Sequence, residues 1–483
     1  MKLLKTFTFL PLLCFGVGAT EHHGTIELSL MNSVGSIHGD HYYANVTVGT
    51  PGQSQTVMID TGSGTTIFAA SNASFCTNST LCPSTLNATQ SSTLEVAYPG
   101  GLDSNYGDGT HLGGDLITDV VQISNLMISN VSMGLAHDIR WNYMPPVSGI
   151  MGLGYSNLNA VPMKMWNEVR QNPSFVETLV KAKAISSRLF SIYLNTPDLY
   201  GSILFGGIDN AKYHGPLTTL NCLSYPDHAI DSWYLKLQEV TMKPYDGPNQ
   251  TLLRSTTLDP WVAIPDTGCA VWHLPTSAYH KVVGYAGVNP MTIAHERGFV
   301  RPCREVAYGN ANATRFQIVF AGNGTNTASL DFELADIFAP LTQENGSMIA
   351  DRYGQPLCRL QIIEVPEYQR VSLISNDVMR AGYWVFDLDN GQISLGQSNL
   401  RANISKVVRV QAGTNGLTQA IENLVFETQA NKVDRMSGST THKLSTATNT
   451  IGYTTGAQFY TTSIVGHSSK SAPRLETQRR LTK

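Results

Sequence analysis

The sequence predicts a mostly β protein built from two similar lobes. Between residues 25 and 400, short alternations of apolar and polar residues are separated by Gly, Asn, Asp and Pro, as in strands joined by turns. Helical patterns are few, and the best are Val161–Gln171 and Ser174–Ala184. The tripeptide Asp-Thr-Gly starts at Asp60 and again at Asp266, each time after an apolar, strand-like stretch. These two copies indicate a duplicated lobe and a mostly antiparallel β fold.

Three stretches show the strand pattern most clearly. Tyr43–Val48 alternates apolar residues with Asn45 and Thr47, which predicts a half-buried strand whose outer face can carry a glycan. Leu116–Ile123 and Ile203–Phe205 have similar patterns.

The composition excludes several classes of protein. Hydrophobic residues make up 42% of the 483 residues and charged residues only 14%, whereas a coiled coil needs far more charge and a disordered chain has fewer apolar residues. The net charge of −4 gives no support for nucleic-acid binding. Residues 401–483 contain eleven Lys and Arg against four Asp and Glu, so a basic tail follows an acidic body.

The N-terminus has the pattern of a secretory signal peptide. Lys2 and Lys5 precede an apolar run that is short for a membrane span, and Val17–Ala19 is typical of a signal-peptidase site. We therefore expect residues 1–19 to be removed, together with Cys14. No later stretch of 18 apolar residues occurs, and a lipid-anchor signal is not expected. The sequence predicts a secreted, extracellular protein without a transmembrane span, with the cell wall or the vacuole as alternative destinations.

Sequons and cysteines agree with export. Six cysteines remain after Cys14, which permits up to three disulfides in a secreted chain. Ten Asn-x-Ser/Thr sequons are expected to be glycosylated. They are Asn45, Asn72, Asn78, Asn87, Asn130, Asn249, Asn312, Asn323, Asn345 and Asn403.

The two Asp-Thr-Gly copies predict a pair of facing carboxyl groups. If the lobes bring Asp60 and Asp266 within a few ångströms, both cannot ionise, and the pair shares one proton. One carboxylate then removes a proton from a water that attacks a carbonyl carbon, while the other protonates the oxygen that develops charge. Each Thr would fix its loop by hydrogen bonds, and each Gly would permit close approach. These residues are Thr61, Thr267, Gly62 and Gly268. No metal and no cofactor is needed.

Six further motifs follow in a fixed order between Tyr42 and Gln397. They are Val48–Pro51, Tyr106–Thr110, Ser148–Gly154, Phe190–Leu194, Gly201–Asp209 and Tyr383–Gly396. Together with the two Asp-Thr-Gly copies, this order closely resembles the pepsin-like aspartic endopeptidases, and most of all their secreted fungal branch.

The resemblance implies a bilobed pepsin-like fold, with two pseudo-symmetric β lobes and the active-site cleft between them. The N-terminal lobe would span residues 42–215 and the C-terminal lobe residues 216–400. A short N-terminal segment, 20–41, would precede them. The Ser/Thr-rich basic tail, 401–483, is expected to be disordered.

The resemblance also implies roles for further residues. Tyr106 would close over the substrate at the tip of a hairpin called the flap. Asp108 would either pair with a substrate lysine or remain a solvated turn residue. The remaining expected substrate contacts are Gly107, Thr110, Ile150, Gly62 and Gly268, and the expected supports of the dyad are Thr61, Ser63, Thr267 and Cys269. Peptide or protein substrates, pepstatin-type inhibitors and a monomeric state are implied as well.

The same resemblance implies two disulfides, Cys76–Cys82 and Cys303–Cys358. Cys222 and Cys269 then remain, either free or joined to each other, and we expect them to be free.

Four departures from the family pattern bear on activity. Ile67 stands where a Trp normally steadies the flap Tyr, Cys269 replaces a Thr or Ser, and Ser375 replaces a Gly. No basic pro-segment is recognisable. The sequence therefore leaves two alternatives open: an active endopeptidase, and a weak or inactive pepsin-fold protein that binds peptides or inhibitors. A two-carboxylate glycosidase is disfavoured, because nothing marks an aromatic sugar platform.

Overall fold

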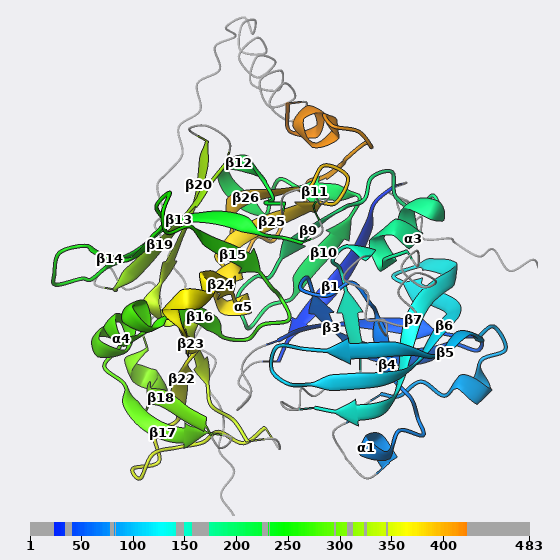
Figure 1. Ribbon diagram of the computed structural model, residues 1–483, viewed down its shortest axis with the longest axis horizontal. Helices are drawn as coiled ribbons and strands as arrows, with labels where there is room; N and C mark the ends of the chain where they lie inside the picture. The colour runs from blue at the N-terminus through cyan, green and yellow to red at the C-terminus, as the bar shows by residue number, and fades with distance from the viewer. Residues whose placement is uncertain are drawn as a thin grey trace, which may run out of the picture. The chain divides into compact units, whose positions relative to one another are not determined.

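Strands dominate the computed structural model of the protein (Figure 1). The structure describes residues 24–33, 41–77, 82, 84–141, 149–156, 173–224, 230, 232–293, 296–306, 313–322, 326–343 and 346–422. The expected signal peptide and most of the expected tail lie outside these residues. The predicted fold class is confirmed: the fold is mostly β and has two lobes.

Both halves of the chain contribute to one large sheet. In the described residues it has 13 strands, in the order β12-β26-β25-β9-β10-β1-β2-β3-β8-β4-β7-β6-β5. The strands are β1 (Ile26–Asn32), β2 (Tyr42–Val48), β3 (Gln53–Asp60), β4 (Ile67–Ala69), β5 (Glu95–Asn105), β6 (His111–Ile123), β7 (Leu126–Arg140), β8 (Gly149–Gly152), β9 (Leu189–Tyr193), β10 (Gly201–Phe205), β12 (Tyr213–Asn221), β25 (Gly382–Asp387) and β26 (Gln392–Ser398). Because β25 pairs with β9, the C-terminal strands join the N-terminal ones directly.

Smaller sheets form the rest of the C-terminal half. The six-stranded sheet contains β13 (Leu235–Lys243), β14 (Gln250–Arg254), β15 (Trp261–Pro265), β19 (Arg315–Ala321), β20 (Thr327–Glu333) and β24 (Val371–Ile374). Beside it, β16 (Trp272–Pro275) pairs with β23 (Ile362–Val365). A four-stranded sheet contains β17 (Asn289–Ile293), β18 (Glu296–Pro302), β21 (Phe338–Pro340) and β22 (Leu357–Leu360).

Parallel strand pairs reveal the internal repeat. In the N-terminal half β3 runs parallel to β8 and β4 parallel to β7, whereas in the C-terminal half β15 runs parallel to β24 and β16 parallel to β23. The first Asp-Thr-Gly starts at the end of β3, and the second follows β15. The two motifs therefore occupy equivalent places in the two halves.

Helices are few and short, as the sequence predicts. The labelled helices of the described residues are α1 (Ser74–Thr77), α3 (Phe175–Lys181), α4 (Thr276–Tyr285) and α5 (Asn376–Met379), with 3-10 turns η1 (Ala88–Gln90), η4 (Cys303–Glu305), η5 (Leu334–Ile337) and η6 (Glu367–Gln369), and residues 416–422 add a further helical stretch. A capping box between Ser174 and Glu177 starts α3 close to the predicted position. The other predicted helix, 161–171, lies outside the described residues. None of the described helices is long and apolar enough to cross a membrane.

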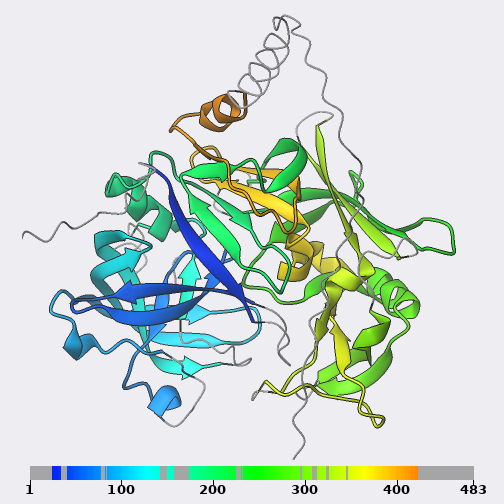
Figure 2. The same ribbon diagram turned by 180° about the vertical axis from the view of Figure 1, so that it is seen from behind.

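The fold extends beyond the predicted lobes at both ends, into the segment expected to precede them and into the expected tail. In the segment expected to precede the lobes, β1 pairs with β10 and β2, and Figure 2 shows this dark blue strand beside the green β10. At the other end, β27 (Val407–Arg409) pairs with β11 (Gly207–Asp209). Residues 416–422 are helical, with Leu417 and Ala420 buried. Because of these contacts, residues 401–422 belong to the fold. The basic composition of the tail gave no indication of them.

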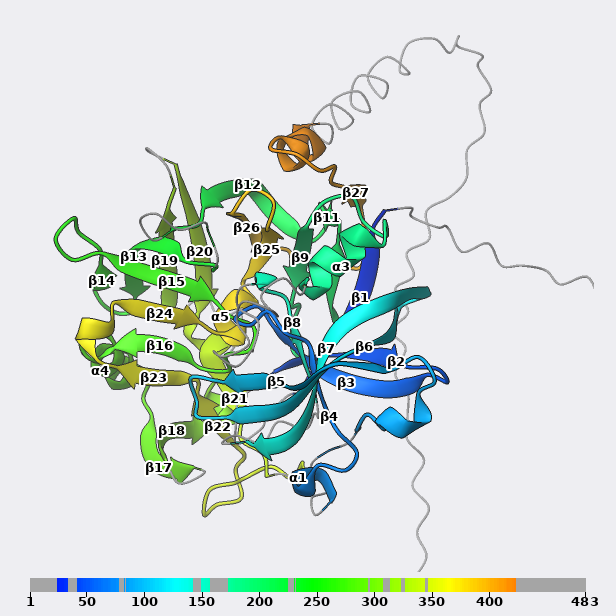
Figure 3. The ribbon, with the colours of Figure 1, turned by 45° about the vertical axis from the view of Figure 1, so that its right-hand side comes forward.

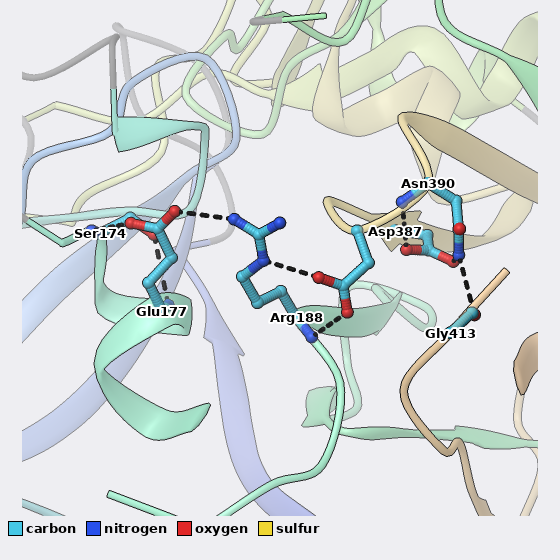
Figure 4. Close-up of polar contacts among 7 residues, drawn as sticks. Ser174, Glu177, Arg188, Asp387, Asn390 and Gly413 are labelled. Atoms are coloured by element: carbon cyan, nitrogen blue, oxygen red, sulfur yellow. Dashed lines mark hydrogen bonds and ion pairs between the residues drawn. The ribbon is translucent and has the colours of Figure 1, made fainter. Parts of the chain in front are cut away.

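Polar contacts tie these C-terminal residues and α3 to the β25–β26 turn (Figure 4). Arg188 lies between Glu177, at 3.0 Å from Nη1 to Oε1, and Asp389, at 2.7 Å from Nε to Oδ1. Beyond that turn, the Asn390 side chain donates to the Gly413 carbonyl at 3.3 Å. Three segments that are distant in sequence are thereby held together.

Both predicted disulfides are present. Cys76 is bonded to Cys82, and Cys303 to Cys358. The prediction for the remaining pair is also confirmed, because Cys222 and Cys269 are free.

The described sequons lie mainly on the surface. Asn45, Asn72, Asn130, Asn249 and Asn403 are exposed, so each is open to the attachment of a glycan. Asn87 is half-buried, and its side chain caps η1 by accepting from the Thr89 amide. Asn78, Asn312, Asn323 and Asn345 lie outside the described residues.

Removing one apolar contact of residues 401–422 should destabilise the whole fold. Leu417 is buried in a cluster with Leu189, Tyr193 and Tyr383, so Leu417→Ala should lower the free energy of unfolding by about 2–4 kcal/mol. The measurement is urea denaturation. Ile404→Ala, at a side chain that is 56% exposed, is the matched control and should change stability by less than about 0.5 kcal/mol. Equal stabilities for the two variants would contradict the docking of this segment.

Candidate active site

The two Asp-Thr-Gly loops are held by hydrogen bonds to strands that occupy equivalent places in the two halves. Asp60 ends β3, and its carbonyl accepts a hydrogen bond from the Leu153 amide, just after β8, at 2.8 Å. Asp266 follows β15, and its amide donates to the Ile374 carbonyl, at the end of β24, at 3.1 Å. Each aspartate therefore lies where a strand and its parallel neighbour end together.

Reciprocal hydrogen bonds join the two loops. The Thr61 amide donates to Thr267 Oγ1 and the Thr267 amide donates to Thr61 Oγ1, each at 3.1 Å. Each hydroxyl then donates across to the other strand, Thr61 to the Pro265 carbonyl at 2.9 Å and Thr267 to the Ile59 carbonyl at 2.8 Å. Both threonines are fully buried, so this four-bond exchange sets the separation of the two aspartates.

The carboxyl groups face each other across the two glycines. A Cβ atom at Gly62 would lie 2.8 Å from Asp266 Oδ2, and one at Gly268 would lie 2.6 Å from Asp60 Oδ1. Any side chain at either position would collide with the opposite aspartate. The sequence predicts close approach at these glycines, and the approaching group is the partner carboxyl.

The hydrogen bonds to the two carboxyl groups are unequal. Asp60 accepts from the Gly62 amide at 2.8 Å and from the Ser63 hydroxyl at 2.6 Å. Asp266 accepts from the Gly268 amide at 2.9 Å. The thiol of Cys269, which replaces the second hydroxyl, instead donates to the Val271 carbonyl at 3.1 Å. Asp266 therefore lacks the side-chain donor that Asp60 has.

This asymmetry decides where the shared proton lies. Burial raises the pKa of both carboxyl groups, because it penalises the charged form. The donors at Ser63 and Gly62 oppose that rise at Asp60, whereas the negative charge of Asp60 raises the pKa of Asp266 further. Both effects favour the protonated form of Asp266.

The flap lies over this pair as the turn between β5 and β6. We call residues 106–110 the flap turn, and Figure 3 shows its hairpin beside β7. The Tyr106 amide donates to the Thr110 carbonyl at 2.9 Å. Burial, and next the charge of Asp60, raises the pKa of Tyr106, which places its ring close to the dyad. Its hydroxyl is buried, and the nearby side chains of Ser104 and Ser63 act in the opposite direction on that pKa.

Ile67 leaves Tyr106 without the tryptophan contact of the family pattern. Ile67 is buried in β4 and has only an apolar side chain, so it cannot supply the donor that the family pattern places there. The flap turn is therefore positioned by its own hairpin.

Three of the predicted substrate contacts have neighbours within the protein, and their contact with a substrate stays a prediction. Asp108 accepts from the Thr110 amide at 2.8 Å and from the Thr110 hydroxyl at 2.9 Å, so both of its oxygens stabilise the flap turn. Thr110 is itself buried. Ile150 is also buried, in β8, where it pairs with Met58 of β3. Gly107 is exposed on the flap turn, as expected.

Two features behind Asp266 were not predicted. Ser375, which replaces a glycine, is fully buried, and its hydroxyl has no hydrogen-bond partner among the described residues. Next to it, the buried Arg380 contacts Asp377 at 3.2 Å and the Asp336 carbonyl at 2.7 Å, which anchors α5. Sequence reasoning missed this anchor, although Asp377 and Arg380 are three residues apart, which is the spacing of an ion pair on a helix.

Loss of the threonine exchange should destabilise both halves. Thr267→Ala removes one donor and leaves the Thr61 amide buried without an acceptor, so we expect a loss of about 2–3 kcal/mol in the free energy of unfolding. Thr267→Ser keeps the hydroxyl and is the matched control. Chemical denaturation compares the two, and a Ser variant as unstable as the Ala variant would contradict a role for the hydrogen bonds.

Stability should depend on pH through the buried aspartates. Because burial raises the folded-state pKa of Asp266, the folded protein binds more protons than the unfolded chain. This contribution is complete below the unfolded pKa of about 3.9 and is lost as the pH rises through the folded value. We therefore expect the melting temperature to fall between about pH 5 and pH 7.5. The Asp266→Asn variant should show a shallower fall.

Calorimetry across this pH range checks the slope. Asp336 and Asp387, whose pKa values burial also raises, leave a residual slope in the variant. The exposed Asp246→Asn is the control and should follow the wild type. Identical slopes for wild type and Asp266→Asn would refute the raised pKa.

Comparisons with known proteins agree with this geometry. The family model for eukaryotic aspartyl protease matches residues 41–398. The chain is 28% identical over 405 residues to the "Probable aspartic-type endopeptidase OPSB" of Arthroderma benhamiae, covering 82% of this chain and 77% of the relative. It is 25% identical to barrierpepsin of Saccharomyces cerevisiae over 77% of this chain and 62% of the relative. Pepsin-3 of Oryctolagus cuniculus is 32% identical over 51% of this chain and 58% of the relative. The chain belongs to the eukaryotic aspartyl protease family, a class of hydrolases.

Proposed function

We propose that this protein is a secreted aspartic endopeptidase that hydrolyses peptide bonds at acidic pH through a water activated by Asp60 and Asp266. The observation that carries the proposal is the pair of facing, buried carboxyl groups with unequal hydrogen bonds. Peptide or protein substrates and pepstatin-type inhibitors are the ligands that such a pair would take.

Unequal protonation supplies a base and an acid at the same time. Asp60, stabilised as the anion by Ser63 and Gly62, takes a proton from the water as its oxygen attacks the peptide carbonyl carbon. Asp266 gives its proton to the carbonyl oxygen, which avoids a full negative charge there. When the tetrahedral intermediate collapses, Asp60 passes its proton to the leaving nitrogen and Asp266 recovers a proton from the hydroxyl. The carbon–nitrogen bond breaks, and the water is consumed.

The flap would exclude water from this chemistry. Tyr106 lies close to the dyad, and closure of the flap turn over a peptide would lower the local dielectric and strengthen each hydrogen bond. A lysine side chain in the substrate would have to share Asp108 with Thr110.

Secretion is supported by the signal-peptide pattern, the two disulfides and the exposed sequons. An acidic extracellular space would suit a pair that must keep one proton. The second candidate, a weak or inactive pepsin-fold protein that binds peptides, is favoured by the missing donor at Cys269 and the unsatisfied hydroxyl of Ser375.

Cleavage of denatured haemoglobin between about pH 2.5 and 6.5, with and without pepstatin, tests the proposal. We expect pepstatin-sensitive cleavage that Asp266→Asn reduces by about a thousandfold or more, because the variant cannot supply the proton. Asp246→Asn makes the same chemical change at an exposed turn residue and should cleave normally. A folded wild-type protein that cleaves nothing at any pH would reject the endopeptidase, and pepstatin binding by that protein would then establish the second candidate.

A further inference from the structure

The edge of β2 that faces away from β3 is only partly covered by other strands. At one end of this edge, residues 31–32 of β1 pair with β2, whereas residues 26–30 of β1 pair with β10 (Figure 2). At the other end, β6 pairs with residues 47–48 of β2. Between these two contacts, no strand of the described residues pairs with residues 44–46 on this edge. An opening therefore lies between β1 and β6.

A groove of about 540 Å³ occupies this opening. Its volume is within the range of sites that hold small ligands. Leu28 and Val46, which are both buried, contribute an apolar floor where β1 and β2 separate. Exposed residues of β1, β2, β3 and β6 form the walls. The groove therefore combines an apolar base with polar sides.

The side chains of the groove suit an uncharged, polar ligand. Among the described residues that line it, Glu27 alone is charged. The hydroxyl and amide groups of Ser29, Gln122 and Ser124 can both donate and accept hydrogen bonds. Tyr200 also lines the groove, and its side chain is 68% exposed. Because the face of an aromatic ring is electron-rich, it packs well against the C–H bonds of a sugar ring. The lining is therefore that of a carbohydrate site.

One of the lining residues is itself an acceptor site for a glycan. Asn45 is exposed in the groove and begins the sequon Asn45-Val46-Thr47. Its Oδ1 atom accepts from the Thr56 hydroxyl of β3 at 2.9 Å. The amide nitrogen, to which a glycan is attached, therefore points away from β3 and towards the groove. The other described sequon asparagines do not line the groove, and they are Asn72, Asn87, Asn130, Asn249 and Asn403.

We infer that this groove holds the first sugars of an N-linked glycan on Asn45, with the ring of Tyr200 packed against them. Attachment forms a bond between Asn45 Nδ2 and the anomeric carbon of the sugar, and the Nδ2 proton leaves. The bond from that carbon to the diphosphate of a lipid-linked sugar donor breaks.

The covalent bond makes binding in the groove intramolecular. Because the sugars are already held beside the groove, contacts that would be weak for a free sugar suffice to keep them there. The seated sugars also cover the unpaired edge of β2, which would otherwise be open to another chain. The inference rests on the proposed secretion, since N-linked glycans are added to exported chains.

Enzymatic release of the glycans from the folded protein tests the inference. The full chain is secreted from a glycosylating host, and a glycoamidase then cleaves the bond between Asn and the first sugar. Mass spectrometry of peptides follows release at each sequon, and each rate is divided by the rate of the same sequon in denatured protein. Because the groove covers the first sugars, the normalised rate at Asn45 should be about fivefold lower than at the exposed Asn249.

Substitutions of Tyr200 separate the ring from its hydroxyl. Tyr200→Ala removes the ring and should raise the normalised rate at Asn45 about fivefold, with no change at Asn249. Tyr200→Phe keeps the ring and should match the wild type. Since Tyr200 is exposed, both variants should remain folded.

A second copy of the chain is the competing occupant of the groove. It would make the glycosylated wild type a dimer by light scattering, and Tyr200→Ala would dissociate that dimer. This result would overturn the inference, as would equal normalised rates at Asn45 and Asn249.

Occupancy of the sequons separates failure of the inference from failure of the proposed function. A chain with a glycan on Asn249 but none on Asn45 overturns the inference and leaves the proposed secretion standing. A chain that is not exported and carries no glycan refutes both. A protected glycan on Asn45 in a protein that cleaves no peptide supports the inference and refutes only the endopeptidase.

Discussion

The hydrogen-bond exchange between Thr61 and Thr267 is the constraint on which the rest of the site depends. The two residues are 206 positions apart, yet each donates to and accepts from the loop of the other. Because all four bonds are buried, a change in loop separation would leave polar groups unsatisfied. The contact of each carboxyl group with the opposite glycine, and with it the shared proton, follows from that fixed separation.

The two loops are related by the internal repeat, but the hydrogen bonds to their carboxyl groups differ. Ser63 supports Asp60, but Cys269 turns its thiol to a backbone carbonyl and leaves Asp266 with its backbone donor. A thiol is a weak donor, so the substitution favours a protonated Asp266 rather than a second anion. This replacement in the repeat therefore agrees with the acid and base roles that we propose. The buried Ser375 hydroxyl nearby has no hydrogen-bond partner among the described residues. This lowers the stability of the folded protein, and the surrounding packing offsets the loss.

The flap turn and the rest of the fold are held in place in different ways. Outside the flap, the fold is held together by the shared sheet, by the Arg188 contacts and by the docking of residues 401–422. The flap turn, in contrast, is shaped by hydrogen bonds within its own hairpin. A peptidase needs this combination, since the dyad must stay fixed while the flap opens and closes.

The sequence alone determined the β class, the two-lobe repeat and the residue types of the dyad, because strand alternation and Asp-Thr-Gly are local patterns. The cysteine pairing came from the family resemblance. Only the tertiary structure decided that β1 and residues 401–422 belong to the fold, that Ile150 is buried, and that the Cys269 thiol turns away from Asp266. Each of these depends on contacts between residues far apart in the chain, which no local pattern encodes.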